Sequence, residues 1–297
     1  MNRFFEMEDK TRRMFWGMLF ILPAVVYFIC LNIWPMFYSF FLSFNDWNLL
    51  NPDKNFVFLN NYFALLHDTV FLRCLINNFC YTLVAVPVGL VLSLAIALLL
   101  NSGIRWLGLF RFMIFMPVIT SGIAAGYIWM WLYEPTFGLI NHLLSFVHLQ
   151  CPFLLSPYTA LASIALMTVW KSLGFQVVIL LAGLTTIPDS IYQAAEMDGA
   201  TGFRRFWHVT LPLLNPTMVF LSVMGVMNGL QLFGEIFVMA PNGGPLNSTR
   251  TVVFHIQQTA FRSYQMGYGS AMTFVLFAII LAVTVFQMKV LTKKFEY

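Results

Sequence analysis

A few polar and ionisable side chains lie inside long apolar stretches of this sequence. Lys171 falls about midway along one stretch, and Glu235 lies in the second half of another. Asn228, Gln231 and Glu235 are spaced i, i+3 and i+7, so one continuous helix would carry all three on one face. Ionisable groups at bilayer depth are costly and commonly face a cavity or a partner group. We therefore expect these side chains to line a pathway.

Aromatic residues accompany this polar row, and the combination suits a sugar. Sugar hydroxyls need donors and acceptors, and the C–H faces of a sugar ring pack on aromatic rings. The predicted substrate pathway consists of Asn228, Gln231, Phe233, Glu235 and Lys171. Two other interpretations stay open: the amides could hydrogen-bond to neighbouring helices, and Glu235 could form an ion pair with Lys171 or Arg250.

A second polar group, Asn77, Asn78 and Thr82, stands where the next apolar stretch begins. We interpret it as a polar cap on a helix in preference to a pathway lining. The five histidines are scattered and have no metal-ligand spacing. The four cysteines form no CxxC and are interpreted as buried apolar side chains. No catalytic residue, metal site or cofactor is predicted for this chain.

The composition indicates a polytopic membrane protein of the all-α class. Of 297 residues, 60% are hydrophobic and 9% are charged, against about 25% charged in soluble domains. A span needs roughly 20 apolar residues. Six spans are predicted, at residues 14–43, 77–100, 109–133, 158–186, 213–239 and 266–291. The net charge of +4 gives no indication of nucleic-acid binding, and the expected surroundings are lipid.

Basic residues assign the sides of the membrane. Eleven of the 16 Lys and Arg residues fall in residues 1–13, near Arg105, in residues 187–216 and at the end of the chain, and only four fall in the alternate loops 45–76, 134–157 and 240–265. Because cytoplasmic loops carry the excess of Lys and Arg, both termini and residues 187–216 are expected in the cytoplasm. Residues 1–13 are expected to be a cytoplasmic lead-in, and residues 14–297 one membrane domain.

Residues 187–216 are the most polar part of the second half, and their local chemistry predicts two short helices joined by a tight turn. Pro188 and Asp189 can open the first helix. Gly199 can take a positive φ and end it. Thr201 can cap a second helix that runs towards Pro212. With an apolar side and charged ends, such a unit suits docking to a partner protein.

The same stretch resembles the EAA loop of permease subunits in ABC importers. The family pattern is E-A-A, three residues, G, nine residues, I-x-L-P, and this chain has Gln193-Ala194-Ala195, Gly199 and Val209-Thr210-Leu211-Pro212 at that spacing. Gln193 and Val209 depart from the pattern, and Gln193 removes a charge. Three weaker elements also resemble this family, around Asn61-Tyr62, Gly138-Leu139-Ile140-Asn141 and Gly243-Gly244-Pro245.

The resemblance is to the MalF/UgpA-like permeases of carbohydrate importers, and it implies a type I ABC importer permease fold. It also implies a second permease subunit, a pair of ATPase subunits that bind ATP and Mg²⁺, and an extracytoplasmic solute-binding protein. The residues expected to couple to the ATPase are Gln193, Ala194, Ala195, Asp198, Gly199 and Pro212. The expected substrate is a sugar or a sugar-like solute such as glycerol 3-phosphate, carried across the inner membrane.

Other classes of protein fit the sequence less well. The chain has no GxxxxGK[ST] pattern, so ATP hydrolysis would have to come from another polypeptide. An ion-gradient-driven secondary transporter would show paired halves and several buried charges, and neither is evident. An intramembrane protease would need a motif such as GxSxG or HExxH, and the sequence contains neither.

Overall fold

The structure is a computed structural model that describes residues 2–51, 53–101 and 107–291, with side chains from residue 12 onward. Arg105, Lys293 and Lys294, which contribute to the predicted orientation, lie outside these residues. The chain divides into two compact units. The first is Met1–Leu66 with Gln258–Phe274, and the second is His67–Gln257 with Val275–Tyr297.

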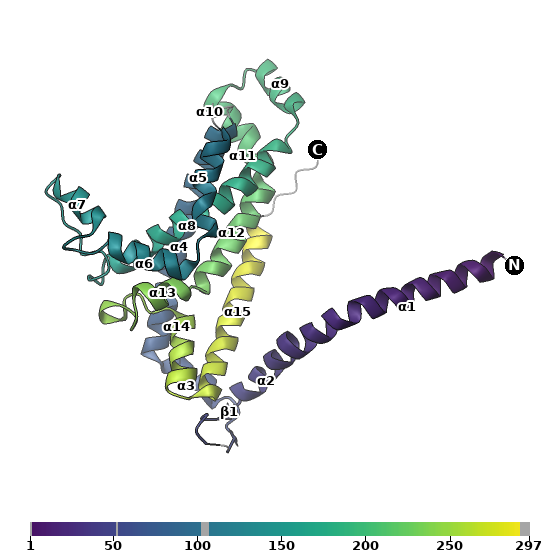
Figure 1. Ribbon diagram of the computed structural model, residues 1–297, viewed down its shortest axis with the longest axis vertical. Helices are drawn as coiled ribbons and strands as arrows, with labels where there is room; N and C mark the ends of the chain where they lie inside the picture. The colour runs from purple at the N-terminus through teal and green to yellow at the C-terminus, as the bar shows by residue number, and fades with distance from the viewer. Residues whose placement is uncertain (1, 52, 102–106, 292–297) are drawn as a thin grey trace. The chain divides into compact units, whose positions relative to one another are not determined.

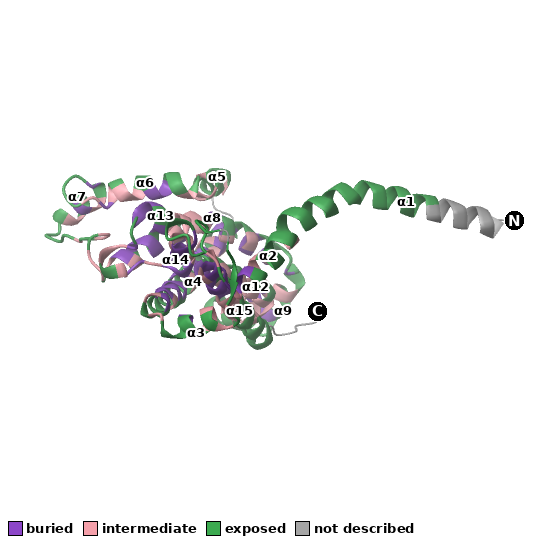
Figure 2. Ribbon diagram, turned by 90° about the horizontal axis from the view of Figure 1, so that it is seen from below, coloured by how far each residue is buried: buried purple, intermediate pink, exposed green. Residues whose placement is uncertain are grey.

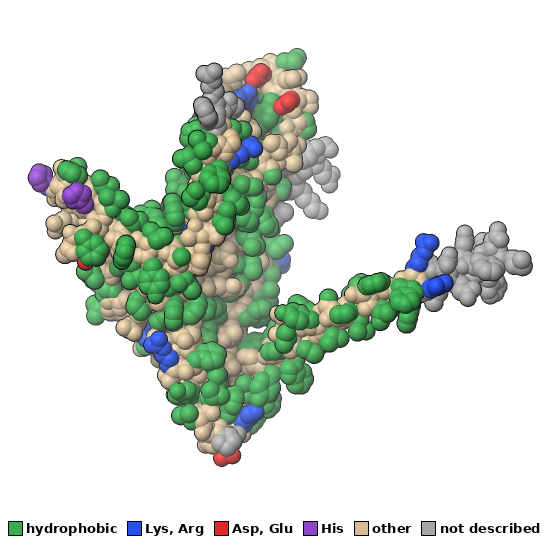
Figure 3. Space-filling view, viewed as in Figure 1, with side chains coloured by type: hydrophobic (Ala, Val, Ile, Leu, Met, Phe, Trp, Pro, Cys, Tyr) green, Lys and Arg blue, Asp and Glu red, His purple; other side chains and the backbone are tan. Residues whose placement is uncertain are grey.

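The first unit is built on a long helical segment and the start of the last helix. Its elements are α1 (Asn2–Phe28), a π-helical turn at Ile29–Ile33, α2 (Trp34–Ser43), a hairpin of β1 (Asn45–Asp46) and β2 (Asn55–Phe56), α3 (Asn60–His67), a π-helical turn at Gln258–Arg262 and the first residues of α15 (Met266–Leu291). Gly267 lets α15 approach β1, because a Cβ there would lie 1.9 Å from the Asn45 carbonyl oxygen. The side chains of α1 from residue 12 onward are exposed and mostly apolar (Figures 2 and 3).

The second unit holds the remaining helices. They are α4 (Thr69–Asn101), α5 (Leu107–Ile119), α6 (Gly122–Leu132), α7 (Leu139–Ser145), α8 (Ala160–Thr185), α9 (Asp189–Met197), α10 (Gly202–Arg205), a π-helical turn at Phe206–Thr210, α11 (Leu211–Leu213), α12 (Asn215–Leu230), α13 (Gly234–Met239), a 3₁₀ turn at Pro245–Asn247 and α14 (Val252–Gln257). Figure 1 shows α9 and α10 at one end of α5, α8 and α12, and α6 and α13 near the other end of these helices.

Helices α4 and α8 form the centre of the second unit, and their apolar side chains make two buried clusters. One cluster gathers around Ile164, Met167 and Ile236, and the other around Leu180, Leu184 and Leu214. Small residues bring the backbones together. Gly174 of α8 lies so close to α5 that a Cβ there would be 2.3 Å from the Ile114 carbonyl oxygen.

In the part of the chain that the structure describes, four helical segments are long and apolar enough to cross a membrane: Arg12–Ser43, Thr69–Asn101, Ala160–Thr185 and Met266–Leu291. They correspond to the first, second, fourth and sixth predicted spans. Two bent pairs of helices raise the number to six when each pair counts as one span. The last predicted span, 266–291, has the same limits as α15.

The third and fifth spans differ from the continuous helices that the sequence predicted. The third bends by 101° between α5 and α6. Helix α5 continues to Ile119, two residues past Pro117, and Ser121 then has an extended backbone, with φ −55° and ψ 138°. The fifth begins with a 67° bend between Gly202–Leu213 and Asn215–Leu230. It then stops at Leu230, and α13 starts only at Gly234.

The second span starts earlier than predicted, and this changes the interpretation of its polar residues. Helix α4 begins at Thr69, where the carboxylate of Asp68 accepts hydrogen bonds from the backbone N–H groups of Val70 and Phe71. Asn77, Asn78 and Thr82 therefore lie well inside the helix and are buried. Their predicted role as a helix cap is wrong, because the capping position is filled by Asp68.

The alternate loops contain more helix than the sequence indicated. Helix α3 and the first residues of α4 occupy the end of 45–76, α7 lies within 134–157, and α14 lies within 240–265. These helices are only six to eight residues long for α7, α14 and α3. Helices this short are marginal by themselves, so tertiary contacts decide their formation more than local propensity does.

Candidate functional site: a polar pocket and a protruding helical turn

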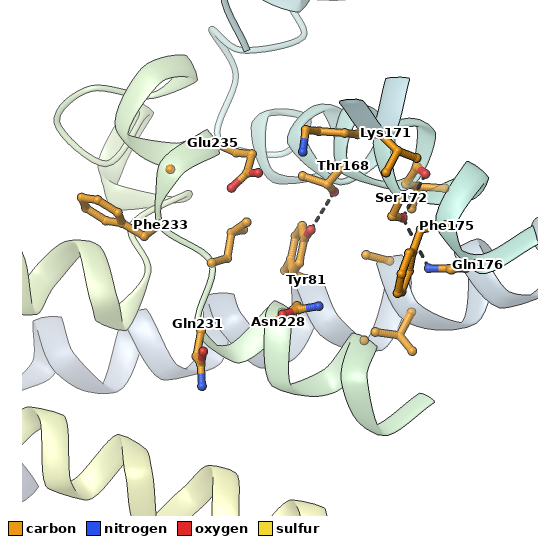
Figure 4. Close-up of a pocket in the computed structure, with 18 residues that line it drawn as sticks. Tyr81, Thr168, Lys171, Ser172, Phe175, Gln176, Asn228, Gln231, Phe233 and Glu235 are labelled. Carbon is orange, nitrogen blue, oxygen red and sulfur yellow. Dashed lines mark hydrogen bonds between the residues drawn. The ribbon is translucent and has the colours of Figure 1, made fainter. Parts of the chain in front are cut away.

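The first candidate site is a pocket of about 470 Å³ in the second unit. It collects side chains from α4, α8, α12, α13 and the break between the last two (Figure 4). All five residues of the predicted pathway line it: Lys171, Asn228, Gln231, Phe233 and Glu235. Further polar and aromatic lining comes from Tyr81, Thr168, Ser172, Phe175 and Gln176.

The geometry that brings these residues together is not the single helix face that the sequence predicted. Gln231 closes α12, and Glu235 belongs to α13, so the i, i+3, i+7 relation does not apply across the break. In Figure 4 the amide of Gln231 points away from Lys171 and Glu235. The pocket is thus assembled by a broken helix, which is a common way to place polar backbone beside a membrane pathway.

Asn78 on α4 holds this break in place. Its Nδ2 donates hydrogen bonds to the carbonyl oxygens of Gly229 and Leu230, at 2.9 and 3.1 Å, and its Oδ1 accepts one from Val252 N–H at 2.8 Å. Thr251 Oγ1 donates to the carbonyl oxygen of Leu232 at 2.8 Å. Side chains thereby bond carbonyl groups at and just after the end of α12, where the helical hydrogen-bond ladder ends.

Lys171 and Glu235 face the same space in the pocket. A Cβ added to Gly122, the first residue of α6, would lie 3.3 Å from Glu235 Oε1 and 3.9 Å from Lys171 Nζ. Among the residues that the structure describes, Glu235 and Lys171 form no ion pair with each other. Both charged groups therefore face the pocket and can meet a polar ligand there.

Hydrogen bonds orient other side chains of the lining. Tyr81 Oη and Thr168 Oγ1 are 2.6 Å apart, which links α4 to α8. Gln176 Nε2 donates to Ser172 Oγ at 3.3 Å, and its Oε1 accepts from Ser93 Oγ at 3.1 Å. The sequence analysis did not single out these residues, although Ser172 and Gln176 are polar residues of an apolar span on the same helix as Lys171.

The second candidate site is the segment 187–216 at one end of the second unit. Helix α9 starts after Pro188 and ends at Met197, as the local signals predicted. Gly199 has φ +77°, Ala200 N–H donates to Ala195 O at 2.8 Å, and Gly199 N–H donates to Glu196 O at 3.0 Å. These two bonds form a Schellman motif, which requires a residue such as Gly199 in the left-handed conformation.

Two details of this segment differ from expectation. Thr201 occupies the N-cap position of α10, but its side chain makes no capping hydrogen bond. Ala195 is buried, with 8% of its surface exposed, whereas Gln193, Ala194 and Asp198 are exposed. Ala195 therefore packs α9 against the rest of the chain. Its neighbours Gln193, Ala194 and Asp198 form the exposed surface.

The exposed surface of this segment combines apolar and charged groups. Met197 is 89% exposed, Phe203 is 76% exposed and Trp207 is 50% exposed. Acidic and basic side chains gather over α9 and α10 in Figure 3. Apolar side chains rimmed by charges mark a protein-interaction surface, and sequence reasoning had not identified Met197 and Phe203 as its prominent members.

Comparison with known proteins shows which family this chain belongs to. Residues 62–296 match the family described as "Binding-protein-dependent transport system inner membrane component". The multiple sugar-binding transport system permease protein MsmF of Streptococcus mutans is 32% identical, with 97% of this chain and 98% of that protein covered. The trehalose/maltose transport system permease protein MalF of Thermococcus litoralis is 32% identical, with 95% of each chain covered.

A solved structure shows the same fold. It is the bacterial alginate ABC transporter in complex with an alginate pentasaccharide-bound periplasmic protein, and one of its chains matches with a TM-score of 0.82 at 19% identity, covering 95% of both chains. The family match and the fold agree with the resemblance found in residues 187–216. This chain belongs to the family of inner-membrane components of binding-protein-dependent transport systems and is the permease subunit of an ABC importer.

Proposed function

We propose that the pocket around Lys171 and Glu235 is where a sugar crosses the membrane part of this permease. The observation that carries this proposal is that a cation, a carboxylate, side-chain amides and aromatic rings meet at a broken helix in one cavity. This set supplies donors, acceptors and apolar faces, which is the chemistry that a sugar requires. The names of the two permease relatives, which refer to multiple sugars and to trehalose and maltose, support it.

The charges of the pocket favour an uncharged sugar over a phosphorylated solute. Among the residues that line it, Lys171 is the cation, and Glu235 brings an opposing negative charge to the same space. Phosphate recognition generally uses several convergent cations or a set of N–H donors. A solute such as glycerol 3-phosphate would therefore need additional cations from a second permease subunit.

We propose that residues 187–216 connect this permease to separate ATPase subunits. The exposed residues Gln193, Ala194 and Asp198 of α9, together with the neighbouring Met197, form the contact surface. Gly199 and Pro212 shape the chain on either side of the second helical stretch. In this proposal ATP and Mg²⁺ are bound by an ATPase dimer, and this chain carries neither a cofactor nor a catalytic group.

The proposed assembly contains a second permease subunit and an extracytoplasmic solute-binding protein. The solute-binding protein would meet the end of the second unit that carries α6 and α13, opposite α9 and α10 (Figure 1). The distribution of basic residues supports cytoplasmic termini and a cytoplasmic α9. The complex with a periplasmic protein in the alginate transporter supports a partner of that kind.

The test is to co-express this chain with candidate second permease and ATPase subunits, reconstitute the complex and add a solute-binding protein loaded with different sugars. We expect ATP-dependent uptake and stimulation of the ATPase by one loaded sugar. Uptake of a phosphorylated solute in preference to every sugar would contradict the proposed substrate class. Uptake that needs an ion gradient and no ATP would contradict the proposed energy source.

A further inference from the structure

The loop that joins α9 to α10 is held at the α9 end by the Schellman hydrogen bonds of Gly199 and Ala200, and open space surrounds its two glycines. Gly199 and Gly202 both have positive φ, +77° and +53°, and no atom lies within 4 Å of a Cβ added at either position. Glycine gives a chain the greatest backbone freedom. Side-chain contacts across this loop therefore add to the backbone hydrogen bonds that hold α9 relative to α10.

Arg205 provides such a contact. Its Nη1 is 2.5 Å from Glu196 Oε1, so the last residue of α10 forms an ion pair with α9 across nine residues of sequence. The same guanidinium lies over the ring of Tyr192, with its Cζ 5.6 Å from the ring centroid. Arginine suits this double role because its planar group can pair with a carboxylate and stack on an aromatic face together.

Tyr192 extends this connection to the core of the second unit. Its ring packs against the buried cluster around Leu180, Leu184 and Leu214, and Phe206, which follows Arg205, packs against the same cluster. A continuous path thus leads from Glu196 on the exposed side of α9, through Arg205 and Tyr192, to the ends of α8 and α12.

We propose that Arg205, Glu196 and Tyr192 form a brace that makes α9 move as one body with the spanning helices, so that signals pass between the ATPase and the pathway. This inference rests on the proposed coupling role of residues 187–216. The side chains of Arg205 and Glu196 are 39% and 55% exposed, and exposed ion pairs add little to folding stability. The brace therefore positions α9 and is not required for the protein to fold.

The test compares Arg205→Met and Glu196→Gln with Arg111→Met in the reconstituted complex. Arg111 is the matched control because it is an exposed arginine on α5, outside residues 187–216. The readouts are co-purification of the ATPase, basal ATPase activity, and the stimulation of ATPase by a sugar-loaded binding protein. A brace predicts normal assembly and basal activity, with stimulation reduced at least about threefold in both brace variants and unchanged in the control.

A double variant separates a shared role from two independent ones. If the pair acts as a brace, Arg205→Met combined with Glu196→Gln loses no more stimulation than either single change. Wild-type stimulation in Arg205→Met, an equal loss in Arg111→Met, or additive losses in the double variant would each overturn the brace. If the complex with Arg205→Met does not assemble, the same measurement is made with Glu196→Gln. Absence of ATP-dependent uptake in the wild-type complex would instead contradict the proposed function.

Discussion

Segment 187–216 and the pocket around Lys171 are built in opposite ways. The segment is defined by residues that are neighbours in sequence: Pro188 before α9 and Gly199 after it. The pocket is defined by residues far apart, because Asn78 on α4 holds carbonyl groups 151 and 152 residues further along the chain. The first region depends on local backbone chemistry, and the second depends on the packing of several helices.

This difference predicts how each region fails. A single backbone change can remove the shape of a locally determined turn, whereas a polar pocket loses one interaction at a time. Changes in segment 187–216 should therefore affect the connection to the ATPase whatever the sugar. Changes in the pocket should reduce sugar passage while the ATPase still responds to its loaded binding protein.

The largest effect is expected from Gly199→Pro. Proline fixes φ near −65° and lacks the N–H that bonds to Glu196 O, so the Schellman motif cannot form. We expect uptake below about a tenth of wild type, which corresponds to more than 1.4 kcal/mol, and loss of the ATPase on co-purification. Gly199→Ala, which places a side chain in the left-handed region at a cost of about 1–2 kcal/mol, should retain part of the activity. Normal uptake by Gly199→Pro would show that this turn does not connect to the ATPase.

A large effect on stability is expected from Asn78→Leu. The fully buried amide makes three hydrogen bonds to backbone groups. Each buried polar group left without a partner costs about 1–3 kcal/mol, so the purified protein should unfold at a temperature several degrees lower. Asn101→Leu, the same change at the exposed end of α4, should leave the unfolding temperature near that of the wild type. Equal unfolding temperatures of the two variants would show that the hydrogen bonds of Asn78 do not hold the helix break in place.

Smaller losses, confined to sugar passage, are expected from Lys171→Met and Glu235→Gln. Each change removes one charged partner for a hydroxyl group, worth about 1.5 kcal/mol, so the initial uptake rate should fall about tenfold. Stimulation of the ATPase by the loaded binding protein should persist. If both variants transport and assemble as the wild type does, the pocket is not the pathway.

The smallest effect concerns acid stability near α14. Burial first, and then the neighbouring Arg250, lower the pKa of His255 from its ordinary value of 6.5, while Asp68 acts in the opposite direction. Below pH 6.5 the unfolded chain takes up a proton that the folded protein does not, so stability falls as the pH drops. His255→Gln, which removes the imidazole, should make the unfolding temperature depend less on pH between pH 7 and pH 5. An unchanged slope would assign the acid sensitivity to other groups.

The sequence predicted segment 187–216 well because its signals are local. Gly199 at the end of α9 and the start after Pro188 follow from residue types alone. The burial of Ala195 could not be predicted in this way, since it depends on how α9 packs against other elements. Apolar length likewise predicted α8 and α15 closely, and missed the bend after Pro117 because a proline within a span can be tolerated or can end the helix.

The pocket shows where sequence reasoning reaches its limit. The residues Asn228, Gln231 and Glu235 were identified because polar groups are costly in an apolar span. The predicted arrangement on one helix face was wrong, because the helix stops at Leu230. Asn78 donates hydrogen bonds to the last carbonyl groups of this helix, and no local pattern reveals that partner. A continuous helix was the simpler expectation for an apolar stretch with no proline in residues 217–239.

The central claim is that connection to the ATPase and passage of the sugar reside in these two separate regions. The most direct measurement is ATPase activity and sugar uptake in one reconstituted complex, with the binding protein loaded, for Gly199→Pro and Lys171→Met side by side. The account predicts that Gly199→Pro loses both activities, and that Lys171→Met loses uptake while its ATPase is still stimulated. Loss of stimulation in Lys171→Met together with normal stimulation in Gly199→Pro would contradict it.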